Sequence, residues 1–409
     1  MEVYLDNSAT TRCFPEAAEL MKQIMCEDYG NPSSLHRKGV QAENHLRTAK
    51  ETIAKILKVN EKELLFTSGG TESDNLALIG AAHANCRRGK HLITTSIEHP
   101  AILQTMKYLE EEGYRVTYLP VDEKGCIRLE DLQRAITGET ILVSIMYTNN
   151  EVGSQQPIAQ AGALIKKMNP QILFHVDAVQ AVGTLPIDVK AMNIDMLSMS
   201  AHKFYGPKGV GALYARKGIR LQPFMHGGAQ ENKHRAGTEN VPGIVGMGKA
   251  IELAEAEREA NAQRLQAMRD RLIAGIEEKI PYARLNGSRT QRLPGHVNFS
   301  FQFIEGESLL MLLDFCGICA SSGSACTSGS LDPSHVLLAI GLPHEIAHGS
   351  LRLTLGRDTT LEDVDFAVDS LKATLQNLRM MSPLYEDFQQ GKVESVIERF
   401  KADGFPYAN

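Results

Sequence analysis

The chain has 409 residues, of which 43% are hydrophobic and 22% are charged, a composition typical of a soluble globular protein with a large core. A chain of this length favours two domains over one. The formal net charge of −6 and the absence of long Lys/Arg runs argue against a protein that binds nucleic acid chiefly through its phosphates.

The first residues, 1–11, contain neither the basic nor the apolar region of a secretory signal. No apolar run approaches the roughly 20 residues that span a bilayer. Seven scattered cysteines are too few for a disulfide framework in a chain this long, so reduced thiols are expected. We therefore expect a cytoplasmic protein without membrane attachment.

From about residue 60 the sequence alternates short apolar runs with helical patterns. This alternation predicts βαβ units and a mainly parallel sheet that is covered on both faces. The predicted strands are residues 64–68, 91–96, 141–148, 172–178, 196–201 and 211–216.

A long helical pattern follows at residues 246–280, and Pro281 ends it. It is interpreted as a connector that leads out of the first domain. Strand-like runs at 296–303 and 350–356, with helices between them, predict a smaller α+β domain. The segment 393–400 is amphipathic, which fits either packing on the body of the protein or docking of a partner.

Polar motifs follow or overlap five of the predicted strands: "TSGGTESDN", "SIEHP", "YTNNEVG", "HVDAVQ" and "SAHKFYGPKG". In a parallel α/β sheet, ligands bind outside the carboxyl ends of the strands. The sequence therefore predicts that these motifs converge on one crevice.

Lys203, in "SAHKFYGPKG", directly follows a predicted strand. An arbitrary lysine is a solvated surface group far more often than a buried one. The crevice position favours the other interpretation, in which Lys203 forms a Schiff base with pyridoxal phosphate (PLP). That cofactor needs an acid facing its pyridine nitrogen, a phosphate cradle and a ring to stack on.

Asp177, within the apolar run "ILFHVDAVQ", suits the first need, because a buried carboxylate requires a cationic partner such as a pyridinium. Its alternative role is to cap a following helix. Gln180, three residues further on, would then reach the phenolic oxygen of the cofactor.

The glycines of "TSGGTES", Gly70 among them, permit close approach of the backbone, and Thr71 begins a predicted helix whose first N–H groups can bind an anion. Many helix caps share this pattern. His99, in "SIEHP", suits a ring stacked on the cofactor, although a solitary histidine is more often structural.

Taken in order, "YLDNSATT", "FTSGGTESDN", "EHPAIL", "NNEVG", "HVDAVQ", "SAHKFYGPKG", "RAGTEN" and "SSGSACTSG" closely resemble the NifS/IscS-type cysteine desulfurases of the class V aminotransferase group. The resemblance runs from residue 4 to about residue 385. It implies the PLP-dependent transferase type I fold, which is aspartate aminotransferase-like, with a mainly parallel seven-stranded sheet in the large domain. The implied large domain is 15–255, and 1–14 with 256–409 form a small α+β domain that carries the cysteine loop, 319–329.

The same resemblance assigns roles residue by residue. It gives Lys203 the Schiff base and Asp177 the pyridinium, with Gln180 on the phenolic oxygen and His99 stacked on the ring and moving protons. It gives the phosphate to Gly70, Thr71, Ser200 and His202, the substrate carboxylate to Asn150 and Arg352, and the neighbouring subunit's phosphate to Thr238. The site would therefore need a homodimer.

The implied reaction removes sulfur from L-cysteine, leaves L-alanine and places the sulfur on Cys326 as a persulfide. Cys326 lies in "CASSGSACTSG", whose small residues have the backbone freedom to carry a thiol between substrate and acceptor. The implied acceptor is an iron–sulfur scaffold protein, with tRNA thiolation as a further route. No membrane and no direct nucleic-acid partner are expected.

Cys316 and Cys319 form a C-x-x-C pattern that suggests a metal or redox pair, but no fourth ligand is evident nearby, so no metal is predicted. Two alternatives stay open. Another PLP enzyme of this fold, such as an aminotransferase or a selenocysteine lyase, would not require Cys326. A non-catalytic persulfide or metal carrier would not require Lys203 together with Asp177 and His99.

Overall fold

The structure is a computed structural model that describes residues 2–322 and 333–403. Within these residues the largest sheet has 7 strands in the order β2-β8-β7-β6-β5-β3-β4. All of its strands run parallel except β8, which is antiparallel to both of its neighbours. The strands are β2 (Leu64–Thr67), β3 (His91–Thr95), β4 (Arg115–Leu119), β5 (Thr140–Ser144), β6 (Leu173–Asp177), β7 (Met196–Ser200) and β8 (Gly211–Ala215). The prediction of a mainly parallel seven-stranded sheet is confirmed.

Successive residues of the central strands enter two different cores, because side chains alternate across a sheet. Leu92 and Leu173 pack with α3 (Gly70–Asn85) and α4 (Pro100–Glu111). Their neighbours Ile93 and Phe174 pack with α6 (Ile158–Met168) and α7 (Val241–Lys279). Burial on both faces explains why these strands read as continuous apolar runs.

The remaining helical elements before α7 complete this part of the chain. They are α1 (Pro15–Cys26), α2 (Arg37–Leu57), α5 (Leu129–Ala135), η1 (Glu61–Glu63), η2 (Ala201–Lys203) and η3 (Glu231–Lys233). Strand β4 is the one strand of the large sheet that the apolar pattern did not predict. Its sequence RVTYL is only partly buried, and it lies at one edge of the sheet.

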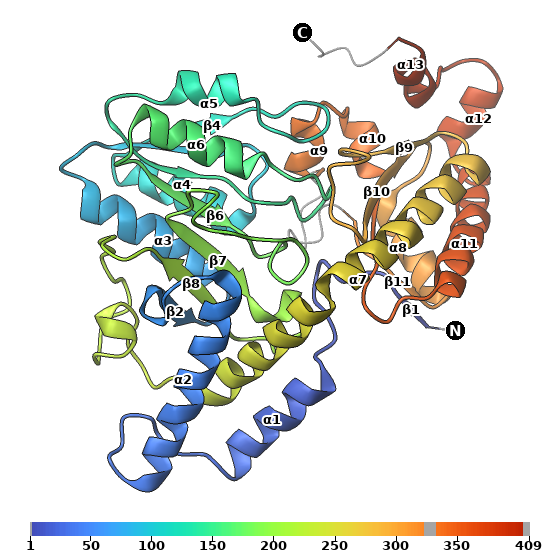
Figure 1. Ribbon diagram of the computed structural model, residues 1–409. Helices are drawn as coiled ribbons and strands as arrows, with labels where there is room; N and C mark the ends of the chain where they lie inside the picture. Colours follow the sequence, from blue (N-terminus) through green and yellow to red (C-terminus); the bar gives the residue numbers. More distant parts are fainter. Residues whose placement is uncertain (1, 323–332, 404–409) are drawn as a thin grey trace.

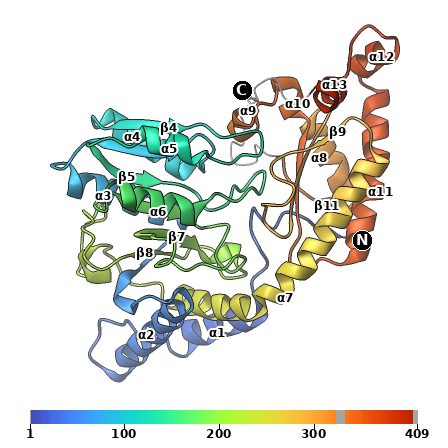
Figure 2. The same ribbon diagram turned by 45° about the horizontal axis from the view of Figure 1, so that its top comes forward.

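A second, antiparallel sheet has the order β12-β10-β9, and a short parallel pair joins β1 to β11. The three-stranded sheet β12-β10-β9 is termed the smaller sheet. Figure 1 shows α7 as a long diagonal helix between the seven-stranded sheet and the smaller sheet, and Figure 2 shows it reaching from α1 and α2 to the smaller sheet. These strands and helices are β1 (Val3–Tyr4), β9 (Ala283–Leu285), β10 (His296–Phe301), β11 (Ile318–Cys319), β12 (Ser350–Thr354), α8 (Gly306–Phe315), α9 (His335–Ala339), α10 (His344–His348), α11 (Leu361–Met380), α12 (Pro383–Gln389) and α13 (Val396–Asp403).

Helix α7 contributes to two separate cores. Ile251 and Ala254 pack in the core of the large sheet, whereas Leu265 and Leu272 pack with the smaller sheet and α11. The predicted domain boundary at 255/256 falls between these two parts of the helix and stays a prediction. Near the end of the chain, Ile397 is buried and belongs to the same apolar cluster as Val336 and Ile346, which favours the packing interpretation of the segment 393–400.

Candidate active site

A cavity of about 280 Å³ lies at the carboxyl ends of β2, β5, β6 and β7. This is the edge at which parallel sheets bind ligands. Its lining residues are Ser8, Ala9, Gly70, Thr71, Asp74, His99, Met146, Thr148, Asn150, Asp177, Val179, Gln180, Ser200, His202, Lys203 and Arg352.

The turn from β2 into α3 places Gly70 and Thr71 at the first turn of a 16-residue helix, beside the cavity. A Cβ atom at Gly70 would lie 2.7 Å from Val179 Cγ2, so a larger residue would displace the opposite wall. The N-terminus of α3, with the hydroxyls of Thr71 and Ser200, forms a group of donors suited to a phosphate.

Lys203 ends the short helix η2 that follows β7. Its Nζ donates to the carbonyl oxygens of Ser8 and Ala9, the second at 2.9 Å. Gln180 Nε2 donates to the same Ser8 carbonyl at 3.0 Å. The N-terminal segment thus forms one wall of the cavity and fixes the lysine amine within it.

Asp177 is the last residue of β6 and is buried, and its Oδ1 accepts a hydrogen bond of 2.9 Å from Val179 N. Burial raises its pKa to about 6, although this bond and the charge of Lys203 lower it. Burial and the adjacent Asp177 also raise the pKa of Asp74, whose Oδ1 has no hydrogen-bond partner within the structure described. A cation placed here would favour the ionised form of Asp177.

His99 precedes α4 and caps it, because its Nδ1 accepts the N–H of Ala101 at 3.1 Å. Burial, with the nearby Lys203 and His335, lowers its pKa to about 4. The imidazole is therefore neutral near pH 7 and carries its proton on Nε2. The structural and the catalytic interpretations of His99 are compatible, since only Nδ1 serves the helix.

Arg352 reaches the cavity from β12, so the two larger sheets both contribute to the site. Its Nη1 donates to Asn150 O and its Nη2 to Asp6 Oδ1, both at 2.9 Å. Its Nε is buried and has no hydrogen-bond partner among the residues described. The guanidinium is thus held at both terminal nitrogens while its Nε–H has no hydrogen-bond partner among the residues described.

The structure brings ten of the predicted site residues around this single cavity: Lys203, Asp177, Gln180, His99, Gly70, Thr71, Ser200, His202, Asn150 and Arg352. Thr238 is exposed and does not line it. Cys326, with most of its loop, lies outside the described residues.

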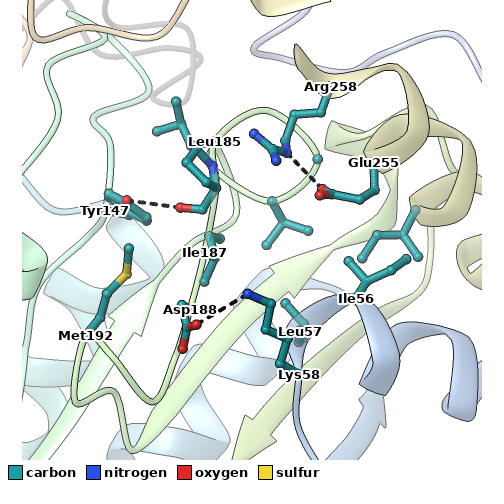
Figure 3. Close-up of a pocket in the computed structure, with 14 residues that line it drawn as sticks. Ile56, Leu57, Lys58, Tyr147, Leu185, Ile187, Asp188, Met192, Glu255 and Arg258 are labelled. Atoms are coloured by element: carbon teal, nitrogen blue, oxygen red, sulfur yellow. Dashed lines mark hydrogen bonds and ion pairs between the residues drawn. The ribbon is translucent and has the colours of Figure 1, made fainter.

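A second cavity, of about 250 Å³, lies between α2, α7 and the segment that follows β6 (Figure 3). It is mainly apolar, and two ion pairs lie beside it, Lys58–Asp188 at 3.4 Å and Arg258–Glu255 at 3.0 Å. Of the predicted site residues that the structure describes, none lines it. The convergent polar groups make the first cavity the candidate active site.

The family described as "Aminotransferase class-V" matches residues 3–366 of the sequence. The chain belongs to this class V aminotransferase family. It is 55% identical over 395 residues to "Cysteine desulfurase IscS" of Clostridium botulinum strain Hall, covering 96% of this chain and 99% of that one. The protein of the same name from Methanosarcina thermophila is 56% identical over 382 residues, covering 93% and 94%. A solved structure titled "NIFS-LIKE PROTEIN" superposes with a TM-score of 0.88 at 41% identity, covering 92% of this chain and 100% of that one.

These matches confirm the predicted resemblance to NifS/IscS-type proteins and the predicted fold. PLP is the cofactor of the class V aminotransferase family, so the cofactor prediction is confirmed at the level of the family. The cavity fits that cofactor chemically. It combines a primary amine on Lys203, a buried carboxylate on Asp177 and an anion-binding helix terminus at Gly70.

Several lining residues of this class V site were not predicted from the sequence. Ser8 and Ala9 lie 195 and 194 residues before Lys203, which they contact, and local sequence contains no signal for such a distant pairing. Asp74 and Thr148 lie inside the motifs "TESDN" and "YTNN", so their place at the ends of strands could have indicated them.

Metal-binding groups, the cysteines of the C-x-x-C pattern and membrane-spanning helices were the other features that the sequence raised. Among the residues described, no group of three or more His, Cys, Asp or Glu side chains is placed to hold a metal ion. Cys316 is exposed and Cys319 is half-buried, and both are free thiols. Of the helices described, none has the length and apolar character needed to cross a bilayer.

Glu98 provides a pH-dependent prediction that needs no turnover. It is fully buried, and its Oε1 accepts hydrogen bonds from Thr95 Oγ1 at 2.8 Å and Met146 N at 2.9 Å. Burial raises its pKa from 4.5 to about 8. Folding therefore favours the protonated acid, and its stabilisation is present below pH 4.5 and lost as the pH rises toward about 8.

Glu98→Gln removes this titration while it keeps the shape of the side chain. We expect the free energy of unfolding of the variant, relative to the wild type, to rise by roughly 3 kcal/mol from about pH 5 to about pH 7.5. Urea unfolding of both proteins at the two pH values measures this difference. A difference that does not change with pH would contradict a buried, protonated Glu98.

Proposed function

We propose that the protein is a cysteine desulfurase that takes the sulfur atom of L-cysteine, leaves L-alanine and carries the sulfur on Cys326. The observation that carries the proposal is the cavity in which Lys203, Asp177 and Arg352 meet. An amine, a buried carboxylate and a guanidinium there match the needs of a PLP enzyme that acts on an α-amino acid. The curated relatives named as cysteine desulfurases support the choice of reaction.

In this proposal the residues around the cavity would hold PLP at four points: its aldehyde carbon, pyridine nitrogen, phenolic oxygen and phosphate. Lys203 would bond to the aldehyde carbon, Asp177 would pair with the pyridine nitrogen, and Gln180 would contact the phenolic oxygen. Gly70, Thr71, Ser200 and His202 receive the phosphate, and His99 stacks on the ring. When bound, the cofactor supplies an electron sink for the electrons released at the substrate Cα.

Two groups handle protons next to the substrate. The Lys203 amine, when it is not bonded to the cofactor, would be placed to take the Cα proton of the substrate and to return a proton to carbon. Neutral His99, with its proton on Nε2, is suited to pass protons to the reacting atoms. Asn150 and Arg352 hold the substrate carboxylate during these steps.

The sulfur transfer conserves atoms and electrons. The thiolate of Cys326 attacks the substrate sulfur, so an S–S bond forms as the C–S bond breaks. The electron pair of the broken bond goes to the substrate, whose carbon is then protonated. The products are a persulfide on Cys326 and L-alanine, and no external oxidant or reductant is needed for this step.

The proposal includes partners and a location. Thr238 is exposed, which suits a residue that completes the phosphate site of a second subunit in a homodimer. The persulfide would pass to an iron–sulfur scaffold protein or to another acceptor, such as a tRNA-thiolation protein. Free thiols at all the described cysteines fit a reducing compartment such as the cytoplasm.

The test compares substrates on the purified holoprotein in the presence of a reductant. We expect L-cysteine to yield alanine and sulfide in equal amounts, and no net transfer of its amino group to a keto acid. Release of selenium from L-selenocysteine without comparable turnover of L-cysteine would favour a selenocysteine lyase. Transfer of the amino group to a keto acid would favour an aminotransferase, and a protein without Schiff-base absorbance would favour a non-catalytic carrier.

A further inference from the structure

We propose that Asp6 positions the guanidinium of Arg352 and thereby makes the cavity selective for substrates with a free carboxylate. This inference deepens the proposed function and rests on it. Asp6 belongs to the N-terminal "YLDNSATT" segment, whose side chains have no role in the proposed function. Asp6 is not among the residues that line the cavity, and it acts through Arg352.

The two contacts of Arg352 fix the plane of its guanidinium. Asp6 Oδ1 accepts from Nη2 and Asn150 O accepts from Nη1, each at 2.9 Å. The side chain of Arg352 is only 3% exposed and that of Asp6 is 18% exposed, so water screens this pair weakly. A planar guanidinium held at both terminal nitrogens has little freedom to rotate.

The donors of Arg352 and Thr148 that have no partner among the residues described favour a carboxylate ligand. Arg352 Nε is buried without a hydrogen-bond partner among the residues described, and so is the Oγ1 atom of Thr148. Both residues line the cavity. A buried N–H without an acceptor is unfavourable, and a ligand that supplies an anionic oxygen removes that cost. An uncharged amide in the same place would supply a weaker acceptor and two superfluous donors.

Asp6 has an anchor that does not depend on Arg352. It pairs with Thr354 as an isolated parallel bridge, two residues beyond Arg352 on the same strand. The backbone N–H of Thr354 donates to Leu5 O at 2.7 Å, and Asn7 Nδ2 donates to Thr354 O at 2.8 Å. The carboxylate of Asp6 is therefore presented to Arg352 by the backbone of the smaller sheet.

The same segment continues to the catalytic lysine. Ser8 N donates to Thr354 Oγ1 at 2.9 Å, and Ser8 O accepts from both Lys203 and Gln180. Three consecutive residues, from Asp6 to Ser8, thus connect the group proposed to bind the substrate carboxylate with the lysine proposed to hold the cofactor. This connection fixes the separation between the carboxylate site and the place where the substrate amine would meet the cofactor.

The test measures ligand binding by the absorbance of the PLP holoprotein, with L-alanine and L-alaninamide as probes. The wild type should prefer the carboxylate. Asp6→Ala should weaken binding of L-alanine by about ten- to a hundredfold and leave alaninamide within about threefold, because a charge-assisted hydrogen bond is lost. In turnover, KM for L-cysteine should rise by a similar factor while kcat stays within about threefold.

Two further variants separate positioning from general damage. Asp6→Asn keeps an acceptor for Nη2 but loses the carboxylate charge, so it should bind L-alanine less tightly than the wild type and more tightly than Asp6→Ala. Asp188→Ala removes a carboxylate from an exposed ion pair with Lys58 and should leave both affinities unchanged. If the Asp6→Ala protein does not bind PLP, the Asp6→Asn variant serves as the test. A weaker preference for L-alanine over L-alaninamide than in the wild type then supports the inference. An unchanged preference overturns it.

Other outcomes also overturn the inference. They are a wild type that does not distinguish the two probes, and an Asp6→Ala variant that binds L-alanine as tightly as the wild type. Equal weakening for both probes would mean a general distortion of the cavity. These titrations require no turnover, so they test the role of Asp6 even if the wild type makes no alanine from L-cysteine. Failure to make alanine would refute the proposed function and not the role of Asp6.

Discussion

Replacement of Lys203 by alanine is expected to abolish the visible absorbance of the lysine Schiff base and to reduce turnover of L-cysteine by at least about a thousandfold. The amine of Lys203 lies in the cavity against the carbonyls of Ser8 and Ala9. No other lysine among the described residues lines that cavity, so we expect the variant to lose both the proposed covalent link to PLP and the proposed base for the Cα proton. Absorbance spectra and alanine release measure the two losses.

Lys208 provides the matched control for Lys203. It lies five residues further along the chain, it is exposed, and it does not line the cavity. Lys208→Ala should keep the Schiff-base absorbance and the turnover of the wild type. A Lys203→Ala protein that retained Schiff-base absorbance would show that another amine binds the cofactor, and would refute the assignment.

Cys326→Ser is expected to keep the colour of the cofactor and to bind L-cysteine, while release of sulfide and alanine falls by at least about a hundredfold. A serine hydroxyl is hardly ionised near pH 7 and cannot accept sulfur as a persulfide, whereas a thiolate is a strong nucleophile. Spectral titration with L-cysteine and an assay of both products distinguish binding from turnover.

Cys316 and Cys319 supply the controls for this variant and test the C-x-x-C pattern at the same time. Cys316→Ser and Cys319→Ser should each retain turnover, since neither residue lines the cavity. Full activity of Cys326→Ser would refute its role as sulfur carrier. Loss of activity in the Cys316 or Cys319 variant would instead indicate a redox or metal role for that pattern.

The central strands and the residues at their ends were predictable because each strand is a short, continuous apolar run that can be identified from neighbouring residues alone. Ile93 and Phe174 lie in runs that are buried on both faces, and such runs stand out in sequence. Asp177 ends one of these runs and Lys203 lies three residues beyond the end of another strand, and parallel strands bring their carboxyl ends to one edge. Strand β4 escaped prediction because an edge strand with partly exposed residues lacks that signal.

The contributions of the N-terminal segment and of the smaller sheet depend on contacts across the whole chain. Asp6 and Arg352 are 346 residues apart, and no spacing or composition pattern connects them. The sequence alone identified Arg352 only through the family resemblance, and it gave no sign that Asp6 is its partner. Likewise, the buried and protonated state of Glu98 results from packing around "SIEHP", which the motif itself does not reveal.

The most direct test of the desulfurase assignment is a single turnover of the holoprotein with L-cysteine in the absence of reductant. The proposal predicts one L-alanine for each sulfur atom retained on the protein, with the added mass of one sulfur on the peptide that contains Cys326. Alanine without protein-bound sulfur, or sulfur found only on a different cysteine, would contradict it.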